Sequence, residues 1–309
     1  MTSDVVALVC KDKGLTSHDA VDLARRKLGI RKIGHSGTLD PFATGLLILG
    51  IGKATRLLEY FKDLRKTYRA KMRLGVITDT YDITGNVVEE RKVDTLSKEM
   101  IEETLKSFLG KQMQVPPAYS ARKHQGQRLY KMARQGKIMN LPPREVEIFS
   151  IELIHYDETK KEVDFSVTVS AGTYIRSLVM DFGYKLETGA TATELVRTEI
   201  GMFSLESAVP VDKLDLSKCL SLSEATSFIP AMILNDSAVN SVILGSQVYA
   251  PMIAKVLDRF SKGQIIRLLD RKKNLVAIAK SERTSKFILG ALAKASGERV
   301  ATLVKVLRG

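Results

Sequence analysis

The stretch that decides how this chain is interpreted is His35-Ser36-Gly37-Thr38-Leu39-Asp40-Pro41-Phe42-Ala43-Thr44-Gly45-Leu46-Leu47. Pro41 biases Asp40 towards an extended backbone, and Gly37 and Gly45 permit tight loops or the close approach of another chain segment. The residues after Asp40 are apolar, so we expect its carboxylate at the edge of a core, where an ionised group needs a partner. For an isolated Asp-Pro pair, a plain turn would be the favoured interpretation.

Hydrophobic periodicity around this stretch predicts an α+β body, with a mostly antiparallel mixed sheet flanked by helices. Strand patterns cover residues 5–9, 67–76, 87–90, 146–156 and 162–170, and helical patterns cover 17–28, 54–61, 97–108 and 174–186. Ser17 is the expected N-cap of the first helix. The clearest strand has basic residues on one face and apolar residues on the other, namely Tyr68, Ala70, Met72, Leu74 and Val76.

The last quarter of the chain differs from the rest in charge, which indicates two domains in the 309 residues. Residues 231–309 contain 14 Lys and Arg against 5 Asp and Glu, whereas residues 1–230 contain 34 against 30. Most of the net charge of +13 therefore lies in the C-terminal part. Short strand patterns at 265–269, 275–279 and 302–306 predict a small β-rich domain there. Its charge favours a polyanionic partner, and nucleic acid over a membrane surface.

Several classes of protein are disfavoured by what the sequence lacks. No apolar run reaches the roughly 18 residues of a membrane helix, and the two cysteines, Cys10 and Cys219, form no paired motif. A cytoplasmic protein is therefore expected. Residues 50–55 resemble the end of a phosphate loop, but Leu47 stands where the motif needs its first Gly and Ala54 stands where it needs Ser or Thr, so the motif is rejected. The four histidines lack metal-ligand spacing, so neither a metal nor a cofactor is predicted.

The 35–47 stretch resembles the catalytic motif of the TruB family, the bacterial tRNA pseudouridine-55 synthases. Other motifs similar to those of this family follow in the family's order: Lys11-Asp12-Lys13-Gly14-Leu15-Thr16-Ser17, Lys66-Thr67-Tyr68-Arg69-Ala70, Thr78-Asp79-Thr80-Tyr81-Asp82, Val115-Pro116-Pro117-Ala118-Tyr119-Ser120-Ala121-Arg122-Lys123, Gly172-Thr173-Tyr174-Ile175-Arg176-Ser177-Leu178 and Leu195-Val196-Arg197-Thr198. Asp12 stands where the family usually has Pro, and Val196 where it has Arg. The resemblance spans roughly residues 5–215.

The resemblance implies a pseudouridine synthase catalytic domain at 1–230, with an insertion near 115–145 that grips the T-arm of tRNA. Residues 231–309 resemble a PUA-type RNA-binding domain. The implied reaction isomerises uridine 55 of the T-loop: the glycosidic bond breaks, the uracil rotates and its C5 joins the ribose. This isomerisation needs no group donor, redox cofactor or metal. The implied partner is the tRNA T-arm stem-loop, and no protein partner is implied.

The resemblance also implies roles for individual residues. Asp40 is the catalytic nucleophile, a role that suits a carboxylate, and the motif leaves open whether it attacks C1′ of the sugar or C6 of the base. Arg176 is implied to hold Asp40. The target nucleotide must be flipped out of the folded RNA. Further substrate contacts are implied for His35, which fills the vacated loop, for Tyr68 and Leu195, which flank the base, and for Tyr174 and Asp82.

RNA contacts from the insertion are expected at Lys123, Arg128, Tyr130, Lys131 and Arg134, where basic side chains for phosphates are interleaved with an aromatic ring. A solvated amphipathic helix is the alternative interpretation of these five residues. For the whole chain, the alternative is a non-catalytic RNA-binding or tRNA-folding protein with the same fold. The intact Asp40 motif favours the enzyme. A guide-RNA-dependent relative is disfavoured because the chain has no long basic tails.

Overall fold

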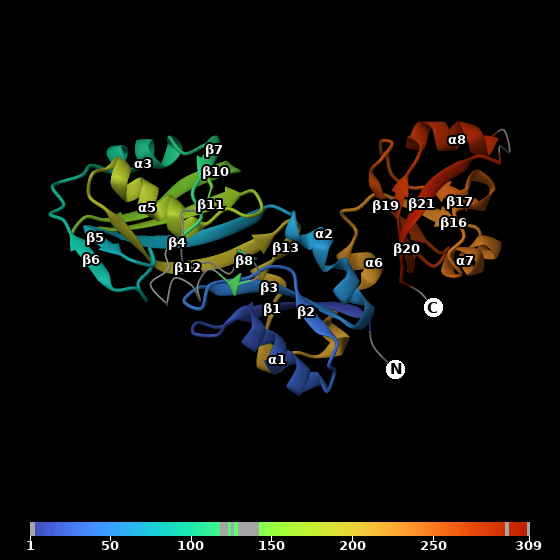
Figure 1. Cartoon of the computed structure of the whole chain (residues 1–309), viewed down its shortest axis with the longest axis horizontal. Coiled ribbons are helices and arrows are strands. Elements are labelled where there is room, and N and C mark those ends of the chain that lie inside the picture. Colours follow the sequence, from blue (N-terminus) through green and yellow to red (C-terminus); the bar gives the residue numbers. More distant parts are fainter. Residues whose placement is uncertain (1–3, 118–122, 125–126, 129–141, 294–296, 308–309) are drawn as a thin grey trace. The chain divides into compact units, whose positions relative to one another are not determined.

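The computed structural model describes residues 4–117, 123–124, 127–128, 142–293 and 297–307. The chain divides into two compact units (Figure 1). The larger comprises Leu8–Leu49 and Leu58–Leu214, and the smaller comprises Met1–Ala7, Gly50–Leu57 and Asp215–Gly309. Within the described residues, no helix combines the length and apolarity that crossing a membrane requires.

A mixed sheet has most of its residues in the larger unit. Its main path runs through β14 (Val209–Pro210), β1 (Val5–Lys11), β3 (Thr44–Ile51), β12 (Ala190–Ile200), β4 (Lys66–Leu74), β11 (Glu162–Val169), β10 (Arg144–Asp157) and β7 (Gly110–Gln114). The β14–β1 and β3–β12 pairs are parallel, while the pairs from β12 to β7 are antiparallel. Three short strands pair off this path: β2 (Ile33–His35), β13 (Phe203–Ser204) and β15 (Leu220–Ser221).

Helices α3 (Lys98–Lys106) and α5 (Ile175–Lys185) bury their apolar sides in one core with the antiparallel strands. Ile101 and Leu105 of α3 and Val179 and Phe182 of α5 are at most 2% exposed. The face of β4 that was predicted to be apolar lies in the same core, as Tyr68, Ala70, Met72 and Leu74. The predicted α+β class, with a mostly antiparallel mixed sheet flanked by helices, is confirmed.

Two predicted elements have other bounds in the structure. The predicted 67–76 strand ends at Leu74 because Gly75 has a positive φ of 85°, and Val76 begins a separate strand, β5 (Val76–Thr78), which pairs with β6 (Val87–Glu90). The predicted 54–61 helix is a 3-10 turn at Gly52–Leu57 followed by α2 (Leu58–Lys62).

The first helix, α1 (Ser17–Leu28), is capped by Thr16 rather than by Ser17. The Thr16 hydroxyl accepts a hydrogen bond from the Asp19 amide, and the Asp19 carboxylate accepts one from the Thr16 amide. This reciprocal capping box satisfies two amides that a helix start leaves unpaired. Ser17 is thereby left available for a contact with the loop that carries Asp40, described below.

The smaller unit contains a six-stranded sheet in the order β17 (Val248–Tyr249), β21 (Arg299–Val306), β20 (Leu275–Ser281), β19 (Ile265–Leu269), β16 (Ala231–Leu234) and β18 (Ile253–Val256). Three of these strands were predicted from the sequence. Helices α7 (Asp236–Ile243) and α8 (Ser285–Ala293) contribute Val242 and Ile288 to its core. A short helix, α6 (Leu222–Ala225), precedes the sheet.

Gly45, in the decisive stretch, sits where β3 meets β12. Its φ is +106°, and a Cβ there would lie 2.4 Å from the carbonyl oxygen and 2.7 Å from the amide nitrogen of Arg197. Gly45→Ala is therefore expected to destabilise the protein by more than about 3 kcal/mol, through backbone strain and lost pairing. Urea unfolding measures this effect.

Gly290→Ala provides a matched control for that substitution. Gly290 lies within α8, and a Cβ there meets nothing within 4 Å. Alanine is expected to stabilise that helix by about 0.5–1 kcal/mol. If Gly45→Ala unfolded at the wild-type urea concentration, the close β3–β12 approach would not be what requires glycine.

Candidate active site

The Asp40 loop connects β2 to β3 and is fixed from both sides by the segment that precedes and starts α1. The Leu39 amide donates to the Ser17 hydroxyl at 2.8 Å, and the Gly14 amide donates to the Pro41 carbonyl at 2.7 Å. Leu39, Phe42 and Ala43 are buried in the main core. Asp40 thus lies at the edge of that core with its side chain 31% exposed.

Arg176, in the first turn of α5, joins Asp40 to Asp82. Its Nε lies 2.8 Å from Asp40 Oδ2 and its Nη1 3.3 Å from Asp82 Oδ2. The same Nη1 donates to the Thr80 carbonyl at 2.8 Å. The Arg176 and Asp82 side chains are only 4% and 6% exposed. The structure therefore brings together Asp40, Asp82 and Arg176, which lie far apart in the sequence. The arginine that contacts both carboxylates is buried.

Asp82 is itself held by its own turn. Its Oδ1 accepts hydrogen bonds from the Thr84 amide and the Thr80 hydroxyl, both at 3.0 Å. The turn is an Asx-type arrangement, in which an aspartate side chain bonds the backbone two residues on. Arg176 is consequently oriented by a fixed carbonyl and a fixed carboxylate, and it can in turn orient Asp40.

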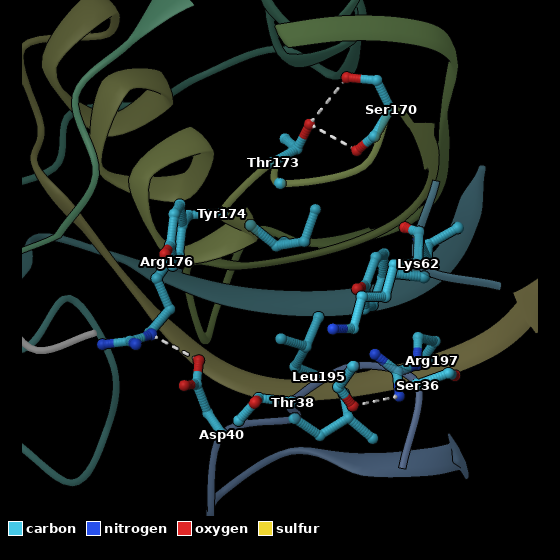
Figure 2. Close-up of a pocket in the computed structure, with 16 residues that line it drawn as sticks. Ser36, Thr38, Asp40, Lys62, Ser170, Thr173, Tyr174, Arg176, Leu195 and Arg197 are labelled. Carbon is cyan, nitrogen blue, oxygen red and sulfur yellow. Dashed lines mark hydrogen bonds and ion pairs between the residues drawn. The ribbon is translucent and has the colours of Figure 1, made fainter. Parts of the chain in front are cut away.

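A cavity of about 350 Å³ opens beside Asp40 (Figure 2). Tyr68 from β4 and Leu195 from β12 line it, and both are buried. Tyr174 also lines it, at the N-cap of α5, with its backbone bonded to the Gln114 side chain in both directions. Five of the seven catalytic or substrate-binding residues predicted from the sequence therefore surround or touch one space: Asp40, Tyr68, Tyr174, Arg176 and Leu195.

Two predicted residues lie outside the lining of this cavity. Asp82 lies behind Arg176, as described. His35, the last residue of β2, is half-buried, and its Nδ1 accepts a hydrogen bond from the Gly37 amide at 3.3 Å. Burial lowers the pKa of His35, and the nearby Arg197 charge acts in the same direction. His35 is therefore adjacent to the cavity-lining residue Ser36 but is not part of the wall.

The end of the cavity away from Asp40 carries residues that were not predicted as site residues. This basic end comprises Ser36, Lys62 and Arg197 (Figure 2). Lys66 also lines the cavity and is close enough to Arg197 for the Arg197 charge to act on it. The sequence does contain a signal for two of them, which is their position on a strand face. Lys66 shares a strand face with Tyr68 and Ala70, and Arg197 shares one with Leu195, so each places a cation where its strand is otherwise apolar.

Lys11 is another buried cation near the Asp40 loop. It is 0% exposed, and its Nζ donates to the carbonyls of Asp12 and Leu15. Burial lowers its pKa to about 8, although the Asp40 charge acts in the opposite direction. Since Gly14, in the segment that Lys11 holds, bonds Pro41, Lys11 contributes to the position of Asp40.

Of the five insertion residues predicted to contact RNA, the structure describes Lys123 and Arg128. The backbones of Lys123 and Arg128 pair in β8 (Lys123–His124) and β9 (Gln127–Arg128). Tyr130, Lys131 and Arg134 lie outside the described residues. Among the residues that the structure does describe, no three His, Cys, Asp or Glu side chains converge as metal ligands.

Asp181 lies on α5, five residues after Arg176, and is half-buried next to Tyr81. Burial raises its pKa to about 6. Between about pH 4 and pH 6 the folded state therefore holds a proton that the unfolded state has released, and stability falls as pH rises through this window. Asp181→Asn should remove the cost of the charged form and stabilise the protein at pH 7 by about 1 kcal/mol after solvent screening.

The test of that effect is a pair of urea unfolding curves for wild type and Asp181→Asn, at pH 4 and pH 7. The gain is expected at pH 7 and should become small at pH 4, where the folded wild type holds the proton and the unfolded wild type still holds it in a little under half of its molecules. A variant less stable than wild type at pH 7 would show that the carboxylate is stabilising at this position instead.

Comparison with known proteins agrees with the motifs and the geometry. Residues 25–175 match the TruB family pseudouridylate synthase (N terminal domain), and residues 230–302 match the PUA domain. A relative named tRNA pseudouridine synthase B, from Thermotoga petrophila, is 46% identical over 306 residues, or 97% of each chain. Another of that name, from Thermosipho melanesiensis, is 49% identical and covers 90% of this chain and 91% of its own.

Solved structures show the same fold. A chain of an H/ACA RNP bound to a substrate RNA containing 2′-deoxyuridine superposes with a TM-score of 0.77 at 26% identity, covering 99% of this chain and 85% of its own. A chain of a Cbf5-Nop10-Gar1 complex gives 0.76 at 28% identity, covering 98% and 84%. The resemblance seen in the motifs is thus confirmed, and this chain belongs to the TruB family of pseudouridylate synthases, with a C-terminal PUA domain.

Proposed function

We propose that this chain isomerises uridine to pseudouridine at position 55 in the T-loop of tRNA, with Asp40 as the nucleophile, and that it acts in the cytoplasm, where tRNA is found. The observation that carries the proposal is the Asp40–Arg176 ion pair of 2.8 Å at the mouth of a cavity lined by Tyr68 and Leu195. The names of the curated relatives support tRNA as the substrate.

Asp40 is arranged to be both accessible and oriented. Its side chain keeps 31% of its surface exposed, while Arg176 contacts Oδ2 and the loop around it is bonded at residues 39 and 41. The Arg176 guanidinium contacts two carboxylates, Asp40 and Asp82, so its single positive charge is shared between them and does not fully neutralise Asp40. A held carboxylate with an accessible oxygen suits covalent attack, at either C1′ or C6 of the nucleotide.

The walls of the cavity suit a flat, weakly polar ring. The Tyr68 side chain and the Leu195 side chain lie on neighbouring strands, because Tyr68 pairs with Arg197 and Leu195 with Ala70 in the β4–β12 register. A pyrimidine can stack on the Tyr68 ring. A stacked and paired base cannot enter such a space, so the nucleotide must be flipped out. In this proposal His35, which is adjacent in the sequence to the cavity-lining residue Ser36, supports the RNA loop that the nucleotide leaves.

The rest of the tRNA contact is assigned to two regions. The insertion supplies Lys123, Arg128, Tyr130, Lys131 and Arg134 for the T-arm. The domain that we assign to 231–309, which contains most of the PUA match, carries an excess of nine positive charges, from 14 Lys and Arg against 5 Asp and Glu. This excess suits phosphate contacts. The remaining residues, 1–230, form the catalytic domain in this proposal.

A tritium-release assay tests the proposed reaction. Forming the C5 glycosidic bond expels the hydrogen on C5, so a tRNA transcript labelled with tritium at C5 of its uridines should release one equivalent to water. A matched transcript with cytidine at position 55 should release none. Release from both transcripts would place the reaction at another uridine, and release from neither would contradict the proposed function.

A further inference from the structure

The basic end of the cavity contains a buried cation that the proposed roles do not use. Arg197 is 2% exposed, and its Nε donates to the Leu46 carbonyl at 2.8 Å. Its Nη2 has only a long contact, 3.5 Å, to the Gly37 carbonyl. Among the described residues, no carboxylate lies within ion-pair distance of Arg197. Neutral carbonyls accept its hydrogen bonds but do not balance its charge, and a buried charge without a counter-ion is costly.

A second observation at the same place points to a missing ligand. Ser36, which also lines the cavity, is 2% exposed, and its Oγ has no hydrogen-bond partner. Buried hydroxyls are normally bonded, because leaving one unpaired costs about 1–3 kcal/mol. An unbonded hydroxyl, on Ser36, and a charge without a counter-ion, on Arg197, therefore belong to two residues that line the same end of the cavity.

The neighbouring ionisable groups leave the basic end positive. Burial and, to a smaller extent, the charge of Arg197 lower the pKa of Lys66 to about 8, against the opposing charge of Asp63. Lys66 Nζ donates to the Lys62 and Leu64 carbonyls, and the exposed Lys62 adds another cation to the lining. Among the described residues that line the cavity, Asp40 carries the sole carboxylate, at the opposite end beside Arg176 (Figure 2).

The strand register places Arg197 next to the space assigned to the base. Arg197 pairs with Tyr68, and Leu195 lies two residues earlier on the same buried face of β12. Side chains two residues apart on one strand are separated by about 7 Å. A pyrimidine between Tyr68 and Leu195 therefore presents one edge to Asp40 and can present another to Arg197 and Ser36.

The reaction moves negative charge between these two ends. If Asp40 attacks C1′, the new C–O bond forms as the C1′–N1 bond breaks, and its electron pair leaves with the uracil as an anion delocalised over N1, O2 and O4. If Asp40 adds to C6, the C5–C6 electron pair moves onto C5 and O4. In both routes the carboxylate loses its charge to the ring. In the first route C5 then attacks C1′ and the Asp40–C1′ bond breaks, which returns its electron pair to Asp40. In the second route the Asp40–C6 bond breaks after C5 has joined C1′, as C5 loses its proton and the C5–C6 double bond reforms. In both routes the proton lost from C5 is balanced by one gained at N1.

We propose that Arg197 and Ser36 bind the carbonyl edge of the flipped uracil and stabilise the negative charge that the ring acquires during the reaction. The inference rests on the proposed function. It gives the buried Arg197 a counter-ion that exists only during catalysis, whereas Asp40 keeps Arg176 beside it in the resting site. Donors fixed in advance at a site of developing charge are the arrangement that favours a transition state over the bound substrate.

The experiment that tests this role changes the stability of the uracil anion as well as the protein. A fluorine at C5 withdraws electrons and stabilises a negatively charged ring. We would measure single-turnover consumption of a T-arm RNA with uridine or 5-fluorouridine at position 55, by wild type, Arg197→Met, Arg197→Lys and Ser36→Ala. Arg73→Met is the matched control, since Arg73 is an exposed cation on the opposite face of β4.

Arg197→Met is expected to slow consumption of the uridine RNA by roughly 10²–10³-fold, the range for removing one donor to an oxyanion. The factor by which it slows consumption of the 5-fluorouridine RNA is expected to be at least about ten times smaller, because the fluorine already stabilises the anion. Arg197→Lys should retain part of the rate, and Ser36→Ala should show the same bias at a smaller size. Arg73→Met should change neither rate. RNA binding should be unaltered, so the loss appears in the rate and not in the affinity.

Equal losses on the two RNAs, or a loss confined to binding, would overturn the inference while leaving the proposed function intact. Wild type that consumes neither RNA would overturn both. If Arg197→Met does not fold, Arg197→Lys and Ser36→Ala decide the matter by the same ratio of rates, because a merely structural role for either residue predicts no dependence on the fluorine.

Discussion

Asp40→Asn is expected to abolish pseudouridine formation while leaving RNA binding within about twofold of wild type. The amide has the shape of the carboxylate and can still accept a hydrogen bond from Arg176, so the loop bonded at residues 39 and 41 keeps its position. It cannot form the covalent bond to the nucleotide. Removal of a nucleophile costs at least about 10⁴-fold in rate.

Two measurements check this expectation. Single-turnover rates of isomerisation give the loss, and a filter-binding titration of the same RNA at fixed salt gives the affinity. Asp12→Asn is a suitable control, since Asp12 is an exposed carboxylate near the same loop and should leave both quantities unchanged. Turnover retained by Asp40→Asn would remove Asp40 from the role of nucleophile.

Arg176→Met is expected to cost about 3–5 kcal/mol of stability, the scale for removing one partner of a buried ion pair, and most of the activity. The substitution leaves Asp82, 6% exposed, and Asp40 without the cation that contacts both. The Thr80 carbonyl also loses its donor. Arg176→Lys keeps the charge but cannot reach the same three acceptors, so it should recover stability only in part.

Urea unfolding and the isomerisation rate measure these effects, and a surface pair supplies the contrast. Arg91 and Glu89 are 2.7 Å apart but 32% and 49% exposed, so Arg91→Met should change the free energy of unfolding far less than Arg176→Met does. Similar losses for Arg176→Met and Arg91→Met would mean that burial does not make the Arg176 contacts important.

The elements that could be predicted from the sequence are those with an undisturbed hydrophobic period. Strand β4 alternates from Lys66 to Leu74, and its face is confirmed. Strand β3 gave no alternation because it is buried on both sides from Gly45 to Ile51. Strand β12 was missed because register shifts at Ala192/Glu194 and Arg197/Glu199 break its period.

Some residues of the site could be predicted from local sequence pattern, and others could not. Asp40 and Arg176 are 136 residues apart, and no local pattern could pair them, so their contact was predicted from family resemblance alone. Arg197 and Lys66 could have been found from local pattern, because each places a cation on a strand face that is otherwise apolar. Ser17 was assigned to a cap because its hydroxyl suits one, but the structure uses that hydroxyl to hold the Leu39 amide.

The most direct test uses the purified full chain, without added cofactor, and an unmodified T-arm hairpin, with pseudouridine mapped at every position after incubation. Conversion at position 55 alone by wild type, and none by Asp40→Asn, is the predicted result. A hairpin that binds tightly but carries no pseudouridine would contradict the proposal and identify the chain as an RNA-binding protein that uses this fold without the chemistry.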